Sequence, residues 1–290
     1  MRMIIRKKDI MPLVTTKQML KEARSDGYAV GAFNAENLEM MQAVVAAAEK
    51  LQAPVIIQTT PSTVSYASTE EYASLAAVLA KKASVPVAVH LDHGSSFELA
   101  SKAYHDGYSS IMIDGSQLSL ENNIALTKRV AEMCRASNIP VEGELGKVGG
   151  KEDDTESDAS VYTDVDEAVK FAAETGVDSL AVGVGTAHGV YKETPILNLK
   201  LISKLKAAVP VPLVLHGASG LSDEVVRECI RRGMCKVNFA TELRIAYTRA
   251  VAEYLRENPE TIDPKKYGAA GREAVQDLAE DKIRVCAGLL

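Results

Sequence analysis

Three of the five histidines in this sequence stand where they could bind one metal ion together. His93, His188 and His216 each lie at the end of a short apolar segment or a few residues after it. Three neutral imidazoles leave one position of a tetrahedral Zn²⁺ open for a substrate, which is the pattern of catalytic zinc. Any one of them alone would more simply be a general base, but three together favour a metal. We expect Asp114 and Glu144 to orient the imidazole N–H groups or to hold an auxiliary metal.

The other two histidines are expected to be structural. His90 lies two residues before Asp92 and on the same side of an apolar segment, so it should fill the interior of the fold with a local hydrogen bond. His105 stands at the end of a helical stretch, where a solvated cation favours the helix dipole. Neither is a candidate ligand.

The elements that must position these side chains follow a regular alternation. Short β-branched segments alternate with stretches of helical periodicity, which predicts a parallel sheet. Eight such units favour a single-domain, closed (β/α)8 TIM barrel over two Rossmann halves, because no linker divides them and no G-x-G-x-x-G motif follows the first strand. The expected strands are residues 29–33, 54–58, 87–91, 110–113, 141–145, 179–183, 213–216 and 236–239.

Polar residues recur at the ends of these expected strands. In a TIM barrel the catalytic groups come from the carboxyl ends of the strands, so polar residues at these positions are candidates for the active site. A solvated surface would not produce the same regularity. The residues are Asn34, Asp92, His93, Asp114, Glu142, Glu144, His188, His216 and Asn238.

Two loops of small residues predict an anion site. Residues 216–220 follow the seventh strand and residues 238–241 follow the eighth, and each loop leads into a helix. Small residues permit close backbone approach, and helix N-termini attract anions. These two loops are the recurrent phosphate site of the TIM barrel. Either loop alone would be an ordinary turn, but the pair beside a metal site favours a phosphorylated substrate.

Two segments fall outside the alternation. The polar, glycine-rich loop of residues 146–160 follows the fifth strand, where we expect a mobile active-site lid rather than a disordered insertion. Residues 1–10 carry four basic side chains that no core position requires. We interpret them as an N-terminal extension to a barrel domain of residues 11–290; a plug under the barrel is the alternative.

Composition excludes several function classes. The 290 residues are 47% hydrophobic and 25% charged, as in ordinary globular proteins. A net charge of −6 disfavours a nucleic-acid partner. The sequence contains no run of about 18 apolar residues, so we expect no membrane span. The N-terminus lacks a secretory core, so we expect a cytoplasmic protein. Four cysteines without a C-x-x-C pair predict reduced thiols and no cysteine metal site.

Five motifs follow one another at the expected strand ends. They are Asp92-His93-Gly94, the loop from Glu144-Leu145-Gly146 through Asp154, His188-Gly189-Val190-Tyr191-Lys192, His216-Gly217-Ala218-Ser219-Gly220 and Asn238-Phe239-Ala240-Thr241. Together they resemble the class II, zinc-dependent ketose-bisphosphate aldolases, from about residue 11 to the C-terminus. Within that family, residues 185–188 and 218–219 are most similar to the tagatose-1,6-bisphosphate aldolase branch, to which fructose-1,6-bisphosphate aldolases are close relatives.

The resemblance implies a role for each matching residue. His93, His188 and His216 would hold Zn²⁺. Asp92 would be the acid/base at the C4 hydroxyl of the sugar, and Glu152 would exchange the C3 proton of dihydroxyacetone phosphate. A monovalent cation, Na⁺ or K⁺, would sit near the bound phosphate. The residues expected to bind dihydroxyacetone phosphate are Asn34, Gly189, Lys192, Gly217, Ala218, Ser219, Asn238, Phe239, Ala240 and Thr241.

Two residues depart from the family pattern. Lys151 stands at a position that is commonly Glu or Gln. Lys265 stands where relatives often have an arginine that contacts the distal phosphate, and a lysine does not reproduce the bidentate geometry of an arginine. The role of Lys265 is therefore left open.

The implied reaction is the reversible cleavage of a ketohexose 1,6-bisphosphate to dihydroxyacetone phosphate and glyceraldehyde 3-phosphate. The carbanion at C3 would be stabilised by a zinc ion acting as a Lewis acid on the C2 carbonyl. A Schiff base on a desolvated lysine is the other solution. Lys236 is expected to open the eighth strand at the opposite mouth of the barrel, so we expect no Schiff base.

Two other functions are compatible with parts of this pattern. A metal-dependent sugar-phosphate epimerase would share the metal and phosphate sites but would not need both Asp92 and Glu152. A non-catalytic subunit that activates an aldolase would have no reason to keep the three histidines and the acid/base.

We expect a homo-oligomer, a dimer or a tetramer, and an activating partner subunit remains an alternative. The choice between tagatose and fructose bisphosphate stays open.

Overall fold

The computed structural model describes residues 13–152, 155–157, 161–191 and 195–289, and of residues 151, 152 and 155–157 it describes the backbone alone. The expected extension at residues 1–10 therefore lies outside the described residues, as does Lys192.

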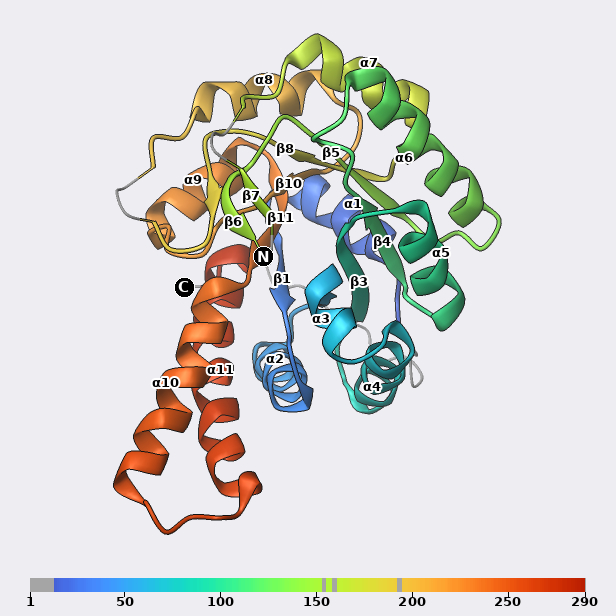
Figure 1. The fold of residues 1–290 in the computed structure, drawn as a ribbon. Helices are drawn as coiled ribbons and strands as arrows, with labels where there is room; N and C mark the ends of the chain where they lie inside the picture. Colours follow the sequence, from blue (N-terminus) through green and yellow to red (C-terminus); the bar gives the residue numbers. More distant parts are fainter. Residues whose placement is uncertain (1–12, 153–154, 158–160, 192–194, 290) are drawn as a thin grey trace.

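Within the described chain, eight parallel strands close into a barrel (Figure 1). The first strand pairs with both the second and the last, which completes the ring. The predicted TIM barrel is confirmed. Its strands are β1 Val30–Asn34, β2 Val55–Thr59, β3 Val87–Gly94, β4 Ser110–Ile113, β5 Val141–Leu145, β8 Ser179–Val182, β10 Leu213–Leu215 and β11 Met234–Phe239.

Helices surround the barrel and follow its strands along the chain, as the alternation predicts (Figure 1). Gly107, Gly176 and Gly233 lie directly after three of them, and Ser68 and Glu71 form a capping box at the start of another. The helices are α1 Thr16–Asp26, α2 Leu38–Leu51, α3 Pro61–Tyr66, α4 Thr69–Lys82, α5 Phe97–Asp106, α6 Leu120–Arg135, α7 Val165–Thr175, α8 Leu199–Ala208, α9 Asp223–Arg232, α10 Thr241–Glu257 and α11 Pro264–Ala287. None of the described helices is long and apolar enough to cross a membrane.

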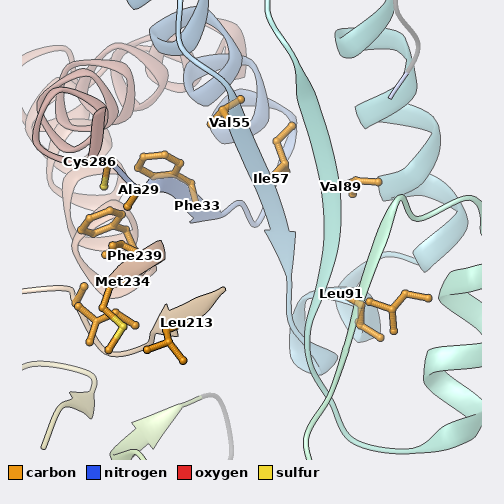
Figure 2. Close-up of a cluster of buried hydrophobic side chains, with 14 of the residues drawn as sticks. Ala29, Phe33, Val55, Ile57, Val89, Leu91, Leu213, Met234, Phe239 and Cys286 are labelled. Carbon is orange, nitrogen blue, oxygen red and sulfur yellow. The ribbon is translucent and has the colours of Figure 1, made fainter. Parts of the chain in front are cut away.

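The core has two apolar parts, because successive side chains of a strand point to opposite faces. Phe33, Ile57, Val89 and Phe239 lie outside the barrel, in the cluster between strands and helices that Figure 2 shows. A second cluster fills the interior near the strand starts, where α1 closes the amino-terminal mouth. It consists of Met19, Leu20, Ala23, Val30, Ala32, Ile56, Ala88 and Cys235. The interior nearer the strand ends is polar.

Two features go beyond the regular barrel. The α10–α11 hairpin projects away from it, and α11 packs against both α10 and α2 (Figure 1). Part of the segment expected as a loop forms strands instead: β6 Gly149–Glu152 and β7 Thr155–Ser157 are an antiparallel hairpin, and β6 also pairs in parallel with β9 Ala187–His188.

Candidate metal and substrate site

The three strand-end histidines converge at the carboxyl-terminal mouth of the barrel. One ring nitrogen from each of His93, His188 and His216 lies within 4.8 Å of the others. His93 has a left-handed backbone with φ of 49°, which is costly for a residue with a Cβ. The centroid of its ring, at the end of β3, lies 5.1 Å from that of His188 and 4.6 Å from that of His216.

Two glycines bring the backbone of His188 close to its neighbours. Gly150 of β6 lies opposite His188, and a Cβ on Gly150 would collide with the carbonyl oxygen of His188. A Cβ on Gly217 would lie 2.6 Å from the carbonyl oxygen of Ala187. Both glycines have positive φ, so both the backbone conformation and the close approach favour the absence of a side chain.

Carboxylates surround the histidine cluster. Asp114 Oδ2 lies 2.8 Å from His93 Nδ1. Burial would raise the pKa of Asp114, but the hydrogen bond to His93, the charge of that ring and the hydrogen bonds from Ser116 together outweigh it and hold the pKa well below its usual range. Glu144 Oε2 lies 3.2 Å from His216 Nδ1 and 4.0 Å from His93 Nδ1. Asp114 and Glu144 therefore both lie next to the imidazoles.

The residues present fit a zinc ion. Nitrogen donors from three imidazoles with oxygen donors beside them are the ligand types that Zn²⁺ prefers. His216 is fully buried, and within the described residues neither its Nδ1 nor the adjacent Glu144 Oε2 makes a hydrogen bond. A cation at the centre of the three imidazoles would give both atoms a partner.

Asp92 lies beside this cluster and is held by three amide groups. Its Oδ2 accepts hydrogen bonds from Asn34 Nδ2 at 3.0 Å and from Gln58 Nε2 at 3.3 Å. Its Oδ1 accepts one from Asn238 Nδ2 at 3.1 Å. Only 1% of Asp92 is exposed, so these bonds determine where its carboxylate points. Gln58 was not singled out from the sequence, although it is the polar last residue of the second expected strand.

A pocket opens next to the histidines and reaches the two loops that were expected to bind phosphate. Ser219 Oγ accepts a hydrogen bond from the backbone N–H of Ala240 at 3.0 Å, which joins the two loops. Tyr191 ties β9 to the first loop, because its hydroxyl accepts from Ala187 N and donates to the Gly217 carbonyl. The pocket is lined by Asn34, His188, Gly189, Gly217, Ser219, Asn238, Ala240, Thr241 and Arg244.

A family model for class II fructose-bisphosphate aldolases matches residues 14–288. The chain belongs to this family. It is 38% identical to the YdjI aldolase from Escherichia coli K12, over 94% of this chain and 97% of that one, with a TM-score of 0.84. It is 31% identical to a provisionally assigned fructose-1,6-bisphosphate aldolase from Coccidioides immitis, over 93% and 94% of the two chains, also with a TM-score of 0.84.

The fold is shared more widely. The fructose-bisphosphate aldolase of Campylobacter jejuni is 23% identical, over 95% of each chain, with a TM-score of 0.80. Class II aldolases are zinc-dependent enzymes that act on phosphorylated sugars, and membership makes this chain an aldolase. The histidine cluster and the pocket lie side by side at the barrel mouth of this aldolase.

The side chains of two expected substrate contacts in this class II aldolase pack in the outer core, and Lys265 lies in the α10–α11 hairpin. The side chain of Phe239 stacks on Phe33 in the outer cluster, with ring centroids 5.5 Å apart (Figure 2), and Ala218 packs in the same cluster. Contact with a substrate would therefore involve the backbone of these two residues. Lys265 lies at the far end of the α10–α11 hairpin, where it pairs with Asp263 (Figure 1). The turn between α10 and α11 projects away from the barrel (Figure 1).

Arg244 is a lining residue that sequence reasoning missed. It follows Thr241 by three residues in α10, so one helical turn brings its side chain back to the pocket. Its Nε donates to Glu36 Oε1 at 2.7 Å, and Thr63 donates to the other oxygen of Glu36. The signal in the sequence was the helical spacing from the expected phosphate loop.

The expectation for Lys236 was wrong. β11 begins at Met234, two residues earlier than predicted, so Lys236 lies inside the barrel below the histidines instead of at the opposite mouth. Its Nζ lies 3.0 and 3.2 Å from the two oxygens of Glu142. Burial would raise the pKa of Glu142, but Lys236 and His216 outweigh it and hold the pKa well below its usual range. Lys236 is therefore engaged in a buried ion pair.

The histidines expected to be structural lie as predicted. His90 is fully buried inside the barrel, and its Nδ1 lies 2.8 Å from Ser110 Oγ. Burial lowers the pKa of His90 well below its usual value. His105 is exposed in the last turn of α5.

Proposed function

We propose that this class II aldolase reversibly cleaves a ketohexose 1,6-bisphosphate to dihydroxyacetone phosphate and glyceraldehyde 3-phosphate. The observation that carries the proposal is that one barrel mouth contains the histidine cluster, the Asp92 carboxylate and a pocket built from two phosphate-type loops. An aldol cleavage needs these three things side by side: an electron sink, a base at the C4 hydroxyl and an anchor for the phosphate.

In this proposal His93, His188 and His216 hold Zn²⁺, and Asp114 and Glu144 orient the imidazoles or hold an auxiliary metal. The bond of 2.8 Å from Asp114 to His93 Nδ1 supports the orienting role, because it directs Nε2 of the same ring toward the cluster. Zn²⁺, when bound, supplies a Lewis acid that polarises the C2 carbonyl of the ketose.

Asp92 removes the proton of the C4 hydroxyl, and the C3–C4 bond breaks as the C4 carbonyl forms. The electron pair of the broken bond passes to C3 and the C2 oxygen, and Glu152 then returns a proton to C3. The amide groups of Asn34, Gln58 and Asn238 hold Asp92 in one orientation for this step. β6 supports the role of Glu152, because Gly150 lies opposite His188 and two residues of strand span about 7 Å.

The pocket beside the histidines receives dihydroxyacetone phosphate. Its anion site combines backbone N–H groups with the start of α10, where the helix dipole favours negative charge. A monovalent cation, Na⁺ or K⁺, accompanies the phosphate. The proposed contacts are Asn34, Gly189, Lys192, Gly217, Ala218, Ser219, Asn238, Phe239, Ala240 and Thr241. Ala218 and Phe239 contribute their backbone alone, because their side chains pack in the outer core.

Tagatose 1,6-bisphosphate is the proposed substrate, because residues 185–188 and 218–219 are most similar to that branch. Fructose 1,6-bisphosphate differs only in the orientation of the C4 hydroxyl and is the second candidate. The relatives named as fructose-bisphosphate aldolases support that second candidate. An epimerase is a weaker alternative, since it would not need a base and a separate proton donor on two sides of the substrate.

The deciding experiment is to assay both bisphosphates with and without a chelator. We expect cleavage of tagatose 1,6-bisphosphate, complete loss of cleavage after chelation and recovery on adding Zn²⁺. Borohydride together with substrate should leave the enzyme active, because no Schiff base forms. Cleavage that survives removal of all metal would contradict the proposal, and interconversion of the two sugars without cleavage would favour the epimerase.

We further propose that the enzyme is cytoplasmic and works as a homo-oligomer, a dimer or a tetramer. An activating, non-catalytic subunit is a second partner to test, by comparing the turnover of the purified chain with that of cell extract. The proposed domain organisation is an extension of residues 1–10 and one aldolase domain of residues 11–290, with a mobile lid in residues 146–160.

A further inference from the structure

A layer of buried charged and polar side chains extends from His216 down into the barrel, and the proposed reaction uses none of its other members. Glu142, Lys236, His216 and His90 are each at most 1% exposed. Glu142 is the centre of this layer. Both of its oxygens accept from Lys236 Nζ, and its Oε1 also lies 3.1 Å from His216 Nε2. Its Oε2 lies 3.4 Å from Ser179 Oγ and 3.7 Å from His90 Nε2.

We propose that Glu142, held in place by Lys236, is a positioning residue that fixes the ring and the tautomer of His216, so that Nδ1 faces the metal site. This inference rests on the proposed metal triad. An imidazole that binds a metal is neutral and carries a single N–H group. A carboxylate can only accept, so the bond to Glu142 places that N–H on Nε2 and leaves the lone pair on Nδ1.

The surroundings of the two ring nitrogens support this orientation. Nδ1 of His216 lies 3.2 Å from Glu144 Oε2, on the side of the ring that faces the cluster, and makes no hydrogen bond within the described residues. Nε2 instead points down into the barrel toward Glu142. A rotation of the ring by 180° would place a C–H group against the buried carboxylate, which would then lose its charge-assisted bond.

Lys236 supplies the counter-charge that stabilises the buried carboxylate of Glu142. A buried carboxylate without a counter-charge is strongly destabilising. Lys236 contacts both oxygens of Glu142 and so holds the carboxylate plane in one orientation, with Oε1 toward His216. The two residues are 94 positions apart in the sequence, on β5 and β11. The ion pair therefore links two strands of the barrel to the orientation of one proposed ligand.

The alternative is that Glu142 and Lys236 merely fill the barrel interior. Replacing a buried ion pair by apolar residues of similar size is often neutral for stability, so the two roles can be separated. The variant Glu142→Met/Lys236→Met removes both charges and the acceptor. The variant Glu142→Gln/Lys236→Met removes both charges but keeps an acceptor for His216. In the second variant the amide nitrogen takes the place of Oε2, where Ser179 Oγ can accept its hydrogen bond.

The test measures metal affinity in the full-length apo-protein, by competition between a chelator and Zn²⁺ or Co²⁺. We expect Glu142→Met/Lys236→Met to bind both metals about 10–100-fold more weakly, the range typical of lost outer hydrogen bonds to ligating histidines. Its visible Co²⁺ spectrum should change, because the His216 ring is released. Glu142→Gln/Lys236→Met should restore the affinity to within about threefold and restore the spectrum, because the acceptor is retained.

Glu280→Gln is the matched control. Glu280 is a buried carboxylate of α11 that pairs with Lys50 at 2.7 Å, and it belongs to no part of the proposed site. It should change the melting temperature without changing metal affinity. Equal metal affinity and equal Co²⁺ spectra in wild type and both double variants would overturn the positioning role and leave the metal triad intact. A wild-type protein that binds neither metal would overturn the triad and this inference together.

Discussion

Replacing Gly217 by alanine should damage the metal site through the backbone of a different strand. Gly217 has φ of 65°, and a Cβ there would lie 2.6 Å from the carbonyl oxygen of Ala187 and 2.9 Å from its carbon. Contacts this short with backbone atoms do not occur, so the segments must separate. Because Gly217 follows His216 and Ala187 precedes His188, that separation moves two of the three proposed ligands apart.

The cost has two parts. A left-handed backbone costs a residue with a Cβ about 1–2 kcal/mol. The displacement of β9 also weakens the hydrogen bonds of the Tyr191 hydroxyl, which accepts from Ala187 N and donates to the Gly217 carbonyl. The loss of one such hydrogen bond costs about 1 kcal/mol. We therefore expect Gly217→Ala to lower the free energy of unfolding by about 2–3 kcal/mol. Zinc affinity should fall at least about tenfold, since each ligand must keep its position.

Gly27→Ala is the matched control for the backbone term. Gly27 ends α1 with φ of 76°, and nothing lies within 4 Å of a Cβ built on it. The Gly27→Ala variant should have a free energy of unfolding lower by about 1–2 kcal/mol and should keep wild-type zinc affinity. The assays are urea unfolding of the apo-proteins and zinc competition against a chelator. If Gly217→Ala matched Gly27→Ala in both measurements, the reasoning from the close approach to Ala187 would be refuted.

Three further outcomes are expected. His216→Ala should neither retain zinc in the purified protein nor turn over, because it removes a proposed ligand; stoichiometric zinc in that variant would count against the triad. Asp92→Ala should lose bond cleavage yet still exchange the C3 proton of dihydroxyacetone phosphate slowly, whereas Glu152→Ala should be impaired in that exchange; equal effects, measured by tritium release, would contradict the division of roles. Deleting residues 1–10 should leave zinc content and turnover unchanged and shift the melting temperature little, because so small an apolar segment buries little area; an insoluble or inactive product would show that the segment belongs to the fold or to a subunit interface.

The sequence by itself determined the barrel and the rim at which the proposed site lies. Apolar periodicity is a local property, so the eight strands and the helices between them could be predicted from short windows. In a barrel of parallel strands, the carboxyl ends of all strands lie at the same mouth. Residues from distant parts of the chain could therefore be assigned to that mouth from the sequence. That is why His93, His188 and His216 could be grouped before any distance was known.

The partners inside the site were decided by the tertiary structure. β11 begins two residues earlier than predicted, so Lys236 lies in the layer beneath His216 and not at the far mouth. There it contacts Glu142. Strand alternation turned the side chain of Phe239 away from the pocket and into the outer core. The hydrogen bond that the Gln58 side-chain amide donates to Asp92 follows from how neighbouring strands are staggered in the closed barrel. Such contacts depend on register and closure, which only the packing of the whole chain settles, because no short window of sequence contains both partners.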